Sequence, residues 1–155
     1  MTGPILDKTF LSARNKRLGL LVWFRLSRFY NLSMRQTNQH LKQWDLSTAQ
    51  FDVLVQIGVH QPITQQQLAG KLEVTKGNIA QLLKKMEALG WITRDQQWKT
   101  KYISLTEAGC RLYEEVVPQQ EQFQASQFCG LTREEQVQLL HLLKKVQQTI
   151  EHEGE

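Results

Sequence analysis

The residues best suited to chemistry lie near the middle of the chain, in the segment TKGNIAQLLKK at positions 75–85. At 100° per residue, one side of this predicted helix is apolar: Ile79, Leu82, Leu83, Met86 and Leu89. The other side carries amides, lysines and a glycine: Gly77, Gln81, Lys84 and Lys85, with Asn78 beside them. Amide side chains can pair with adenine edges, and lysine reaches guanine or phosphate. The pattern predicts a helix that reads DNA, although an ordinary solvated helix face would have the same residues.

The neighbouring elements would hold this helix in place. An N-cap cluster at 45–48 opens one helix that ends before Pro62, and Thr64 caps a short second one. Residues 73–75 then form the turn into a helix from Lys76 to Leu89, which Gly90 closes. Two strands follow, Trp91–Arg94 and Lys101–Leu105, with a connecting loop over Asp95–Thr100. A helix-turn-helix followed by a hairpin is the winged form of that motif.

Long helices flank this centre. A predicted helix from Leu11 to Trp44 would be about 45–50 Å long, more than a monomer of 155 residues can cover. Thr132 and Glu135 form a capping box that opens a last helix with an apolar stripe at 137–150. We therefore expect a mainly α fold with a small β-hairpin wing: one domain over 1–155, a winged core at 46–105, and dimerisation helices at 11–44 and 106–151.

Charge is distributed unevenly. The net charge is +4, made up of +6 over residues 1–50, +3 over 51–105 and −5 over 106–155. A basic front half suits a polyanionic partner. The most apolar stretch, 18–32, contains Arg25 and Arg28 and makes a poor membrane span, and two cysteines are too few for a disulfide framework. A cytoplasmic protein without membrane contact is expected.

Several short motifs together resemble the multiple antibiotic resistance regulator (MarR) family of winged helix-turn-helix transcription factors. They are Leu68-Ala69 with Leu72, Val74 and Thr75; the run 86–92, MEALGWI; and Leu105-Thr106-Glu107-Ala108-Gly109. The resemblance covers residues 11–150 and implies a homodimeric, sequence-specific regulator, a repressor, on a pseudo-palindromic operator in double-stranded DNA. The expected DNA-binding residues are Gln65, Thr75, Lys76, Gly77, Asn78, Gln81, Lys84, Lys85, Arg94, Lys99 and Lys101.

The wing departs from the family pattern. The loop at 95–100 is short, and Gln97, Trp98 and Lys99 stand where the family has an Asp-x-Arg signature. Trp98 could stack on sugar or protein, but we expect it to fold back on the domain. The shortened wing also leaves open an alternative function, a winged-helix module that binds protein and has weak or no affinity for DNA.

The family resemblance also implies a cleft for small aromatic or anionic effectors that relieve repression. Candidate residues on the first helix are Trp23, Arg25, Arg28, His40 and Trp44. The competing interpretation, which we favour, places the aromatic residues in the core and dimer seam and the arginines toward solvent or DNA.

Enzymatic and metal chemistry find little support in the sequence. The four histidines are scattered, and no glycine loop for phosphate, no G-x-S-x-G and no H-E-x-x-H is present. Residues near Cys110 offer only Glu107 and Glu114 as further ligands, and residues 1–109 contain no cysteine at all. We expect no enzyme activity, no cofactor, no metal and no thiol sensor.

Overall fold

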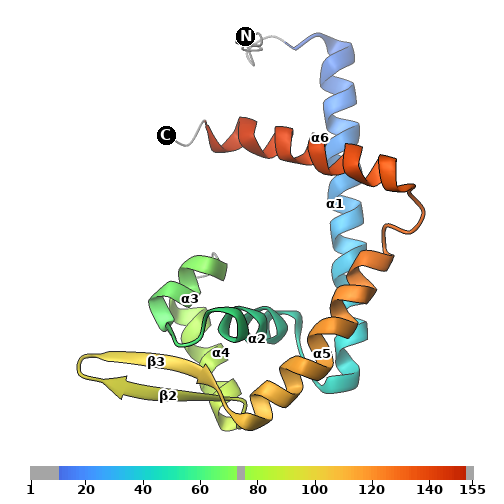
Figure 1. The fold of residues 1–155 in the computed structure, drawn as a ribbon. Helices are drawn as coiled ribbons and strands as arrows, with labels where there is room; N and C mark the ends of the chain where they lie inside the picture. Colours follow the sequence, from blue (N-terminus) through green and yellow to red (C-terminus); the bar gives the residue numbers. More distant parts are fainter. Residues whose placement is uncertain (1–10, 73–75, 153–155) are drawn as a thin grey trace.

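The structure, a computed structural model, describes residues 11–72 and 76–152 of the chain. The elements in chain order are α1 (Ala13–Leu41), the 3-10 turn η1 (Lys42–Trp44), α2 (Thr48–His60), β1 (Ile63–Thr64), α3 (Gln65–Leu72), α4 (Lys76–Ala88), β2 (Ile92–Gln97), β3 (Thr100–Leu105), α5 (Glu107–Ser126) and α6 (Arg133–Glu151). In Figure 1 the short helices and the hairpin lie on one side of the molecule, α1 and α6 on the other, and α5 joins them. The predicted fold class is confirmed.

Helix α2 lies at the centre of the winged core because both of its sides are covered. Val53, Leu54 and Ile57 are fully buried in a cluster shared with α3, α4 and the sheet. Phe51 packs instead against Val116 and neighbours from α1 and α5. Each such side chain contributes about 1.5–3 kcal/mol on burial. Helix α2 therefore couples the winged core to the long helices.

The sheet has a third strand that sequence periodicity did not predict. Strand β1 pairs antiparallel with β3, placing Ile63 opposite Ile103, and the strand order is β1-β3-β2. Two residues are too few to show an alternating pattern, so β1 leaves no signal of its own. It anchors the inner strand of the hairpin to the start of α3.

The hairpin is longer than expected. Asp95 pairs with Tyr102, Gln96 with Lys101 and Gln97 with Thr100, so only Trp98 and Lys99 form the turn. The predicted loop over Asp95–Thr100 was therefore wrong. These polar residues have little strand preference, but the register fixed by the buried residues at the hairpin's base extends outward through ladder hydrogen bonds.

Two helices end earlier than the sequence suggests. Helix α1 stops at Leu41 and continues as the 3-10 turn η1, after which Asp45 adopts the left-handed conformation with φ 54°. Helix α4 ends at Ala88, and Leu89 is 48% exposed rather than on the buried side. Gly90 adopts φ 78°, which confirms the predicted left-handed helix end.

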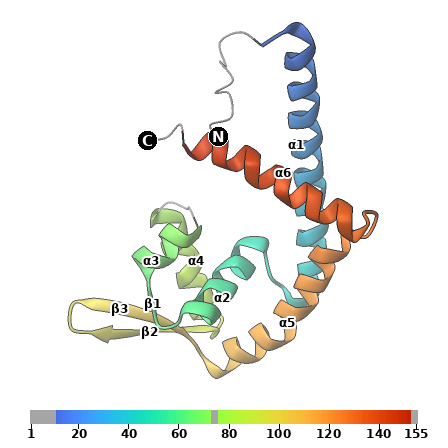
Figure 2. The same ribbon diagram turned by 45° about the horizontal axis from the view of Figure 1, so that its top comes forward.

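The long helices expose most of their apolar surface. Apart from Val59, Leu89 and Trp98, the exposed large hydrophobic side chains of the described residues are Leu11 and residues of α1 and α6. The joint between α5 and α6 is held to α1, because Phe128 contacts Phe29 and the Ser33 hydroxyl donates to the Gln127 side chain. Beyond that joint, the start of α1 extends away from the winged core, while α6 crosses α1 and runs toward the side of the short helices without lying on them (Figure 2).

Candidate nucleic-acid interface

Helix α4 presents its polar side to solvent because its apolar side is fixed in the core. Ile79, Leu83 and Met86 are at most 1% exposed. At 100° per residue, Gln81 points almost directly away from the mean direction of these three side chains. The other described residues expected at DNA on this helix are also exposed: Gly77, Asn78, Lys84 and Lys85. The helix therefore offers amides, lysines and a small residue on one continuous surface.

The beginning of this surface is described only in part. Thr75 lies outside the described residues, and Lys76 is placed as the first residue of α4. Gln65 is half-buried at the start of α3. Nearby, Thr64 and Gln67 cap α3 reciprocally, since each backbone N–H donates to the other residue's side chain. This capping fixes the first helix of the helix-turn-helix and leaves Gln65 beside it.

Arg94 connects the wing to α4. Its Nε lies 3.2 Å from Oε2 of Glu87, and its side chain is only 20% exposed. Glu87 is the single acidic residue of α4. The ion pair therefore neutralises the one carboxylate of α4, a role that the expectation of Arg94 among the DNA-binding residues did not include.

The turn into α5 holds the base of the hairpin against the end of α4. The Thr106 hydroxyl donates to the Gly90 carbonyl at 2.5 Å and accepts from the Gly109 N–H at 3.0 Å. The Thr106 N–H also donates to the Trp91 carbonyl at 3.0 Å. These bonds explain the spacing of Leu105-Thr106-Glu107-Ala108-Gly109: its threonine and glycine set the position of the wing relative to α4.

The end of the wing carries an exposed aromatic residue. Trp98 is 86% exposed, so the expectation that it folds back on the domain was wrong. The two-residue turn puts it at the extreme of the hairpin, where no other element is near enough to cover it (Figure 1). Lys99 Nζ lies 4.8 Å from the centroid of the Trp98 ring. Lys101, further down β3, is exposed.

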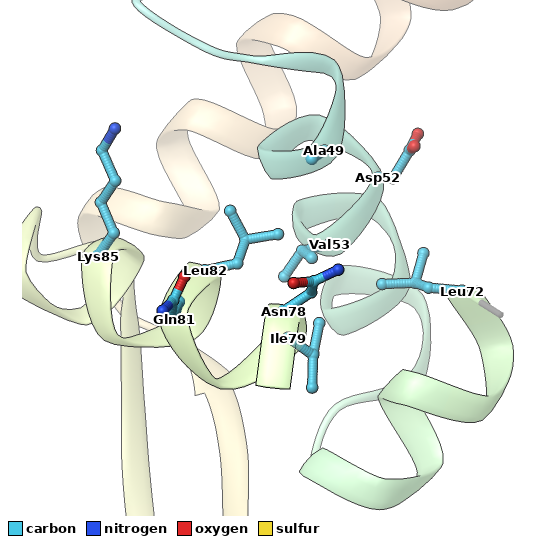
Figure 3. A pocket seen from close by; sticks show the side chains of 9 residues that line it. All are labelled: Ala49, Asp52, Val53, Leu72, Asn78, Ile79, Gln81, Leu82 and Lys85. Atoms are coloured by element: carbon cyan, nitrogen blue, oxygen red, sulfur yellow. The ribbon is translucent and has the colours of Figure 1, made fainter. Parts of the chain in front are cut away.

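A hollow of about 490 Å³ lies between α2 and α4. Its floor is apolar and its edge carries Asp52, Asn78, Gln81 and Lys85, with Lys85 and Asp52 on opposite sides in Figure 3. Burial raises the pKa of the Asp52 carboxyl above its ordinary value. Three of these edge residues belong to the expected DNA-binding set, so any occupant of the hollow would lie beside the exposed polar side of α4.

The five expected effector residues do not gather in one place. His40 and Trp44 contact each other, with ring centroids 5.3 Å apart, and His40 also stacks on Phe123 at 4.2 Å. Trp23, Arg25 and Arg28 lie exposed on α1, and the 12 residues from Arg28 to His40 span about 18 Å of helix. Within one chain these residues form two separate groups.

Cys110 is half-buried near the start of α5, and Cys129 is exposed in the joint before α6. Within residues 11–72 and 76–152, no three His, Cys, Asp or Glu side chains are grouped so that they could hold a metal ion. None of the helices in these ranges is both long and apolar enough to cross a membrane.

These features define a winged helix-turn-helix protein. Comparison with known proteins places it more narrowly, since the MarR family matches residues 46–97. An HTH-type transcriptional regulator of Bacillus cereus is 49% identical over 134 residues, which are 86% of this chain and 91% of the relative. The chain belongs to the MarR family of transcriptional regulators.

Solved structures agree with this assignment. The oxidised form of MarR from E. coli is 30% identical, has a TM-score of 0.70, and is matched over 79% of this chain and 91% of its own. The S. aureus MepR–DNA complex shares the fold with a TM-score of 0.72 at 24% identity, over 82% of this chain and 94% of its own.

Proposed function

We propose that the chain is a homodimeric repressor that binds a pseudo-palindromic operator in double-stranded DNA and is released by a small aromatic or anionic effector. The exposed side of α4 carries this proposal. From Lys76 to Met86 the helix has three lysines and no carboxylate, and its one acid, Glu87, is paired with Arg94. Such a surface can enter a major groove without repelling phosphate. The proposal includes no catalytic activity, and it places the protein with the chromosome in the cytoplasm.

The proposed roles of the DNA-facing residues follow from their positions. Gln81 and Asn78 read base edges in the major groove. The remaining residues of the set hold phosphates or allow close approach: Gln65, Thr75, Lys76, Gly77, Lys84, Lys85, Lys99 and Lys101. Arg94 acts by keeping the wing and α4 together through Glu87. Phosphate contacts set the orientation of the protein, and base contacts set its sequence preference.

Dimerisation follows from the uncovered apolar side chains of α1 and α6. Trp23, Phe24, Val137 and Ile150 are each at least 60% exposed in the single chain. Large apolar side chains exposed in this number mark an interaction surface. A two-fold dimer would place two α4 helices in successive major grooves, about 34–36 Å apart.

The alternative function, a protein-binding module with little affinity for DNA, rested on the apparent shortness of the wing. The hairpin instead has two strands of six residues each, Ile92–Gln97 and Thr100–Leu105. A wing of this length can reach the DNA backbone, so the DNA-binding function is the better supported one.

Selection from a random library of DNA duplexes with the full-length protein tests this function. We expect enrichment of one pseudo-palindrome whose half-site centres are about 10 base pairs apart, bound by two chains. Native mass measurement of the complex gives the number of chains. Failure to enrich any sequence, or an asymmetric site bound by one chain, would overturn the proposal.

We further propose that the effector enters the hollow between α2 and α4. Its volume, about 490 Å³, suits a small ligand, and its apolar floor with Lys85 at the edge suits an aromatic acid. Occupation of this hollow would displace side chains that contact DNA.

Salicylate, an aromatic acid, is a suitable probe for the proposed effector site between α2 and α4. We expect it to weaken the complex of the wild-type protein with the selected duplex. Ala49→Phe should weaken DNA binding in the absence of salicylate and remove the further response to it, because a phenyl ring at this position fills the hollow that salicylate would occupy. His40→Ala is the matched control. Loss of the response in His40→Ala alone would place the effector beside His40, between α1 and α5.

A further inference from the structure

Trp98 is the residue whose position the fold does not explain. It is the first of the two residues in the turn between β2 and β3, and 86% of its surface is exposed. An indole in this position buries almost no apolar area, so it contributes little to the stability of the core. Exposed aromatic side chains that do not pack in their own domain are typical of contact surfaces.

The backbone at Trp98 strengthens this argument. Its φ is 55°, and Lys99 is not among the residues with positive φ. A two-residue hairpin turn with positive φ only at its first position is type II′, where glycine is favoured. A bulky residue in this conformation is strained, and strain of this kind accompanies functional positions. The turn therefore holds a large aromatic side chain where a glycine would serve folding better.

The charge around Trp98 favours a polyanion as the partner. Residues 96–101 contain two lysines and no acidic residue. Lys99 Nζ lies over the indole ring at 4.8 Å, and the Gln96 amide donates to the Trp98 carbonyl at 2.8 Å. These contacts brace the turn while leaving the outer edge of the ring open. A protein partner would need acidic or apolar complementarity, whereas DNA supplies phosphates and apolar sugar walls together.

The wing is also fixed relative to α4. The ion pair between Arg94 and Glu87 and the hydrogen bond from Thr106 to the Gly90 carbonyl join the hairpin to that helix. In both Figure 1 and Figure 2 the tip of the hairpin points away from α1, α5 and α6. When α4 occupies a major groove, a wing held in this way meets the neighbouring stretch of backbone and the minor groove beyond it.

We propose that Trp98 enters this minor groove and reads A·T base pairs there, an inference that rests on the proposed DNA-binding function. The indole is flat enough to stand between sugar walls about 6 Å apart. Its N–H is a donor only, and the minor-groove edge of an A·T pair presents only acceptors, adenine N3 and thymine O2. Lys99 neutralises the phosphates on one side of the groove.

The same chemistry disfavours G·C pairs at this position. Guanine adds its N2 amino group, a donor, to the floor of the minor groove. That amino group would clash with the indole ring. It would also place one hydrogen-bond donor against another, the indole N–H. An inosine·cytosine pair lacks the amino group, so its minor groove resembles that of A·T while its major groove resembles that of G·C. This pair separates minor-groove reading by Trp98 from major-groove reading by α4.

The test uses the full-length protein and the duplex enriched from the random library. Each A·T pair flanking the half-site is replaced in turn by G·C or by I·C, and affinity is measured for wild type, Trp98→Phe, Trp98→Ala and Lys99→Ala. For wild type, we expect a G·C substitution at one flanking position to weaken binding about 3- to 10-fold, the range of one hydrogen bond, and I·C to restore it. Trp98→Phe and Trp98→Ala should bind G·C and A·T duplexes equally, while Lys99→Ala keeps the discrimination at lower affinity.

The outcomes separate the inference from the function on which it rests. A duplex can be enriched and yet show no A·T preference at its flanking positions, or one that Trp98→Ala does not remove. Either result would overturn the inference about Trp98 and leave the DNA-binding function standing. If Trp98→Ala binds every duplex as the wild type does, Trp98 does not contact DNA and the inference is overturned in favour of a protein partner for the indole. If no duplex is enriched, the proposed function fails and the inference with it. Thermal unfolding of each variant confirms that the exposed substitutions leave the fold intact.

Discussion

Gly109 lies so close to Trp91 that a Cβ atom built on it would be 1.9 Å from the Trp91 carbonyl oxygen. The first turn of α5 is thus packed directly on the backbone that leads from α4 into the wing. The contact joins the start of α5 to the backbone between α4 and the hairpin.

Gly109→Ala should therefore destabilise the protein by about 1–3 kcal/mol and weaken DNA binding, because the backbone must shift to admit the methyl group. Gly70→Ala is the matched control, since nothing lies within 4 Å of a Cβ at that position of α3. In a helix that change is neutral or stabilising by about 0.5–1 kcal/mol. Chemical denaturation of both variants checks the prediction, and equal stabilities would contradict it.

Val146→Glu should dissociate the dimer. Val146 is 53% exposed in the single chain and lies on the apolar side of α6. Burying a carboxylate in an apolar interface costs several kcal/mol, so we expect the dissociation constant to rise at least about a hundredfold. Val59→Glu, at a valine of α2 that is 61% exposed, is the control and should remain dimeric. Light scattering at micromolar concentration distinguishes them; a folded wild-type monomer of 18.1 kDa would refute the dimer itself.

Trp98→Gly should leave the free energy of unfolding unchanged or slightly higher. Removing a bulky residue from positive φ relieves about 1 kcal/mol of strain, while the lost contact with Lys99 and the greater freedom of glycine when unfolded each offset part of that gain. The measurement is urea denaturation at equilibrium. A marked loss of stability would show that the indole serves folding after all.

Asp52→Asn should stabilise the protein near neutral pH. Burial raises the pKa of the Asp52 carboxyl above 3.8, so its ionised form costs free energy in the folded state. A raised folded pKa of an acid means that stability is greatest below the unfolded pKa and declines as the pH rises through the folded value. The gain from Asp52→Asn should therefore be larger at pH 7 than at pH 4. An equal gain at both pH values would attribute the effect to something other than ionisation.

Much of the fold could be predicted because its signals are local. Helical periodicity fixed the apolar side of α4, and capping residues such as Ser47, Thr106 and Thr132 mark helix starts that the structure places at the same residues. The aromatic residues of α1 were expected in the core and the dimer seam, because their helical spacing explains them and the predicted helix is longer than one chain can cover.

The remaining features depend on contacts between segments distant in the sequence. The pairing of Gln96 with Lys101 follows from strand register established at the base of the hairpin, and β1 exists only because β3 lies beside it. The ion pair of Arg94 with Glu87 requires the wing to return to the end of α4. Trp98 was misplaced because an aromatic side chain is ordinarily drawn toward a core, and only the two-residue turn shows that no core is within its reach.

The most direct test of the central claim measures binding of wild type, Gln81→Ala and Lys99→Ala to single-base variants of the enriched duplex at several salt concentrations. Gln81 points away from the buried side of α4, so Gln81→Ala should cost about 1–3 kcal/mol on the preferred sequence and remove the base preference at one position of each half-site. Lys99→Ala should weaken binding to all variants equally and lower the salt slope by about one unit per wing that touches phosphate. If Gln81→Ala retains every base preference of the wild type, α4 is not the DNA-reading helix and the account is contradicted.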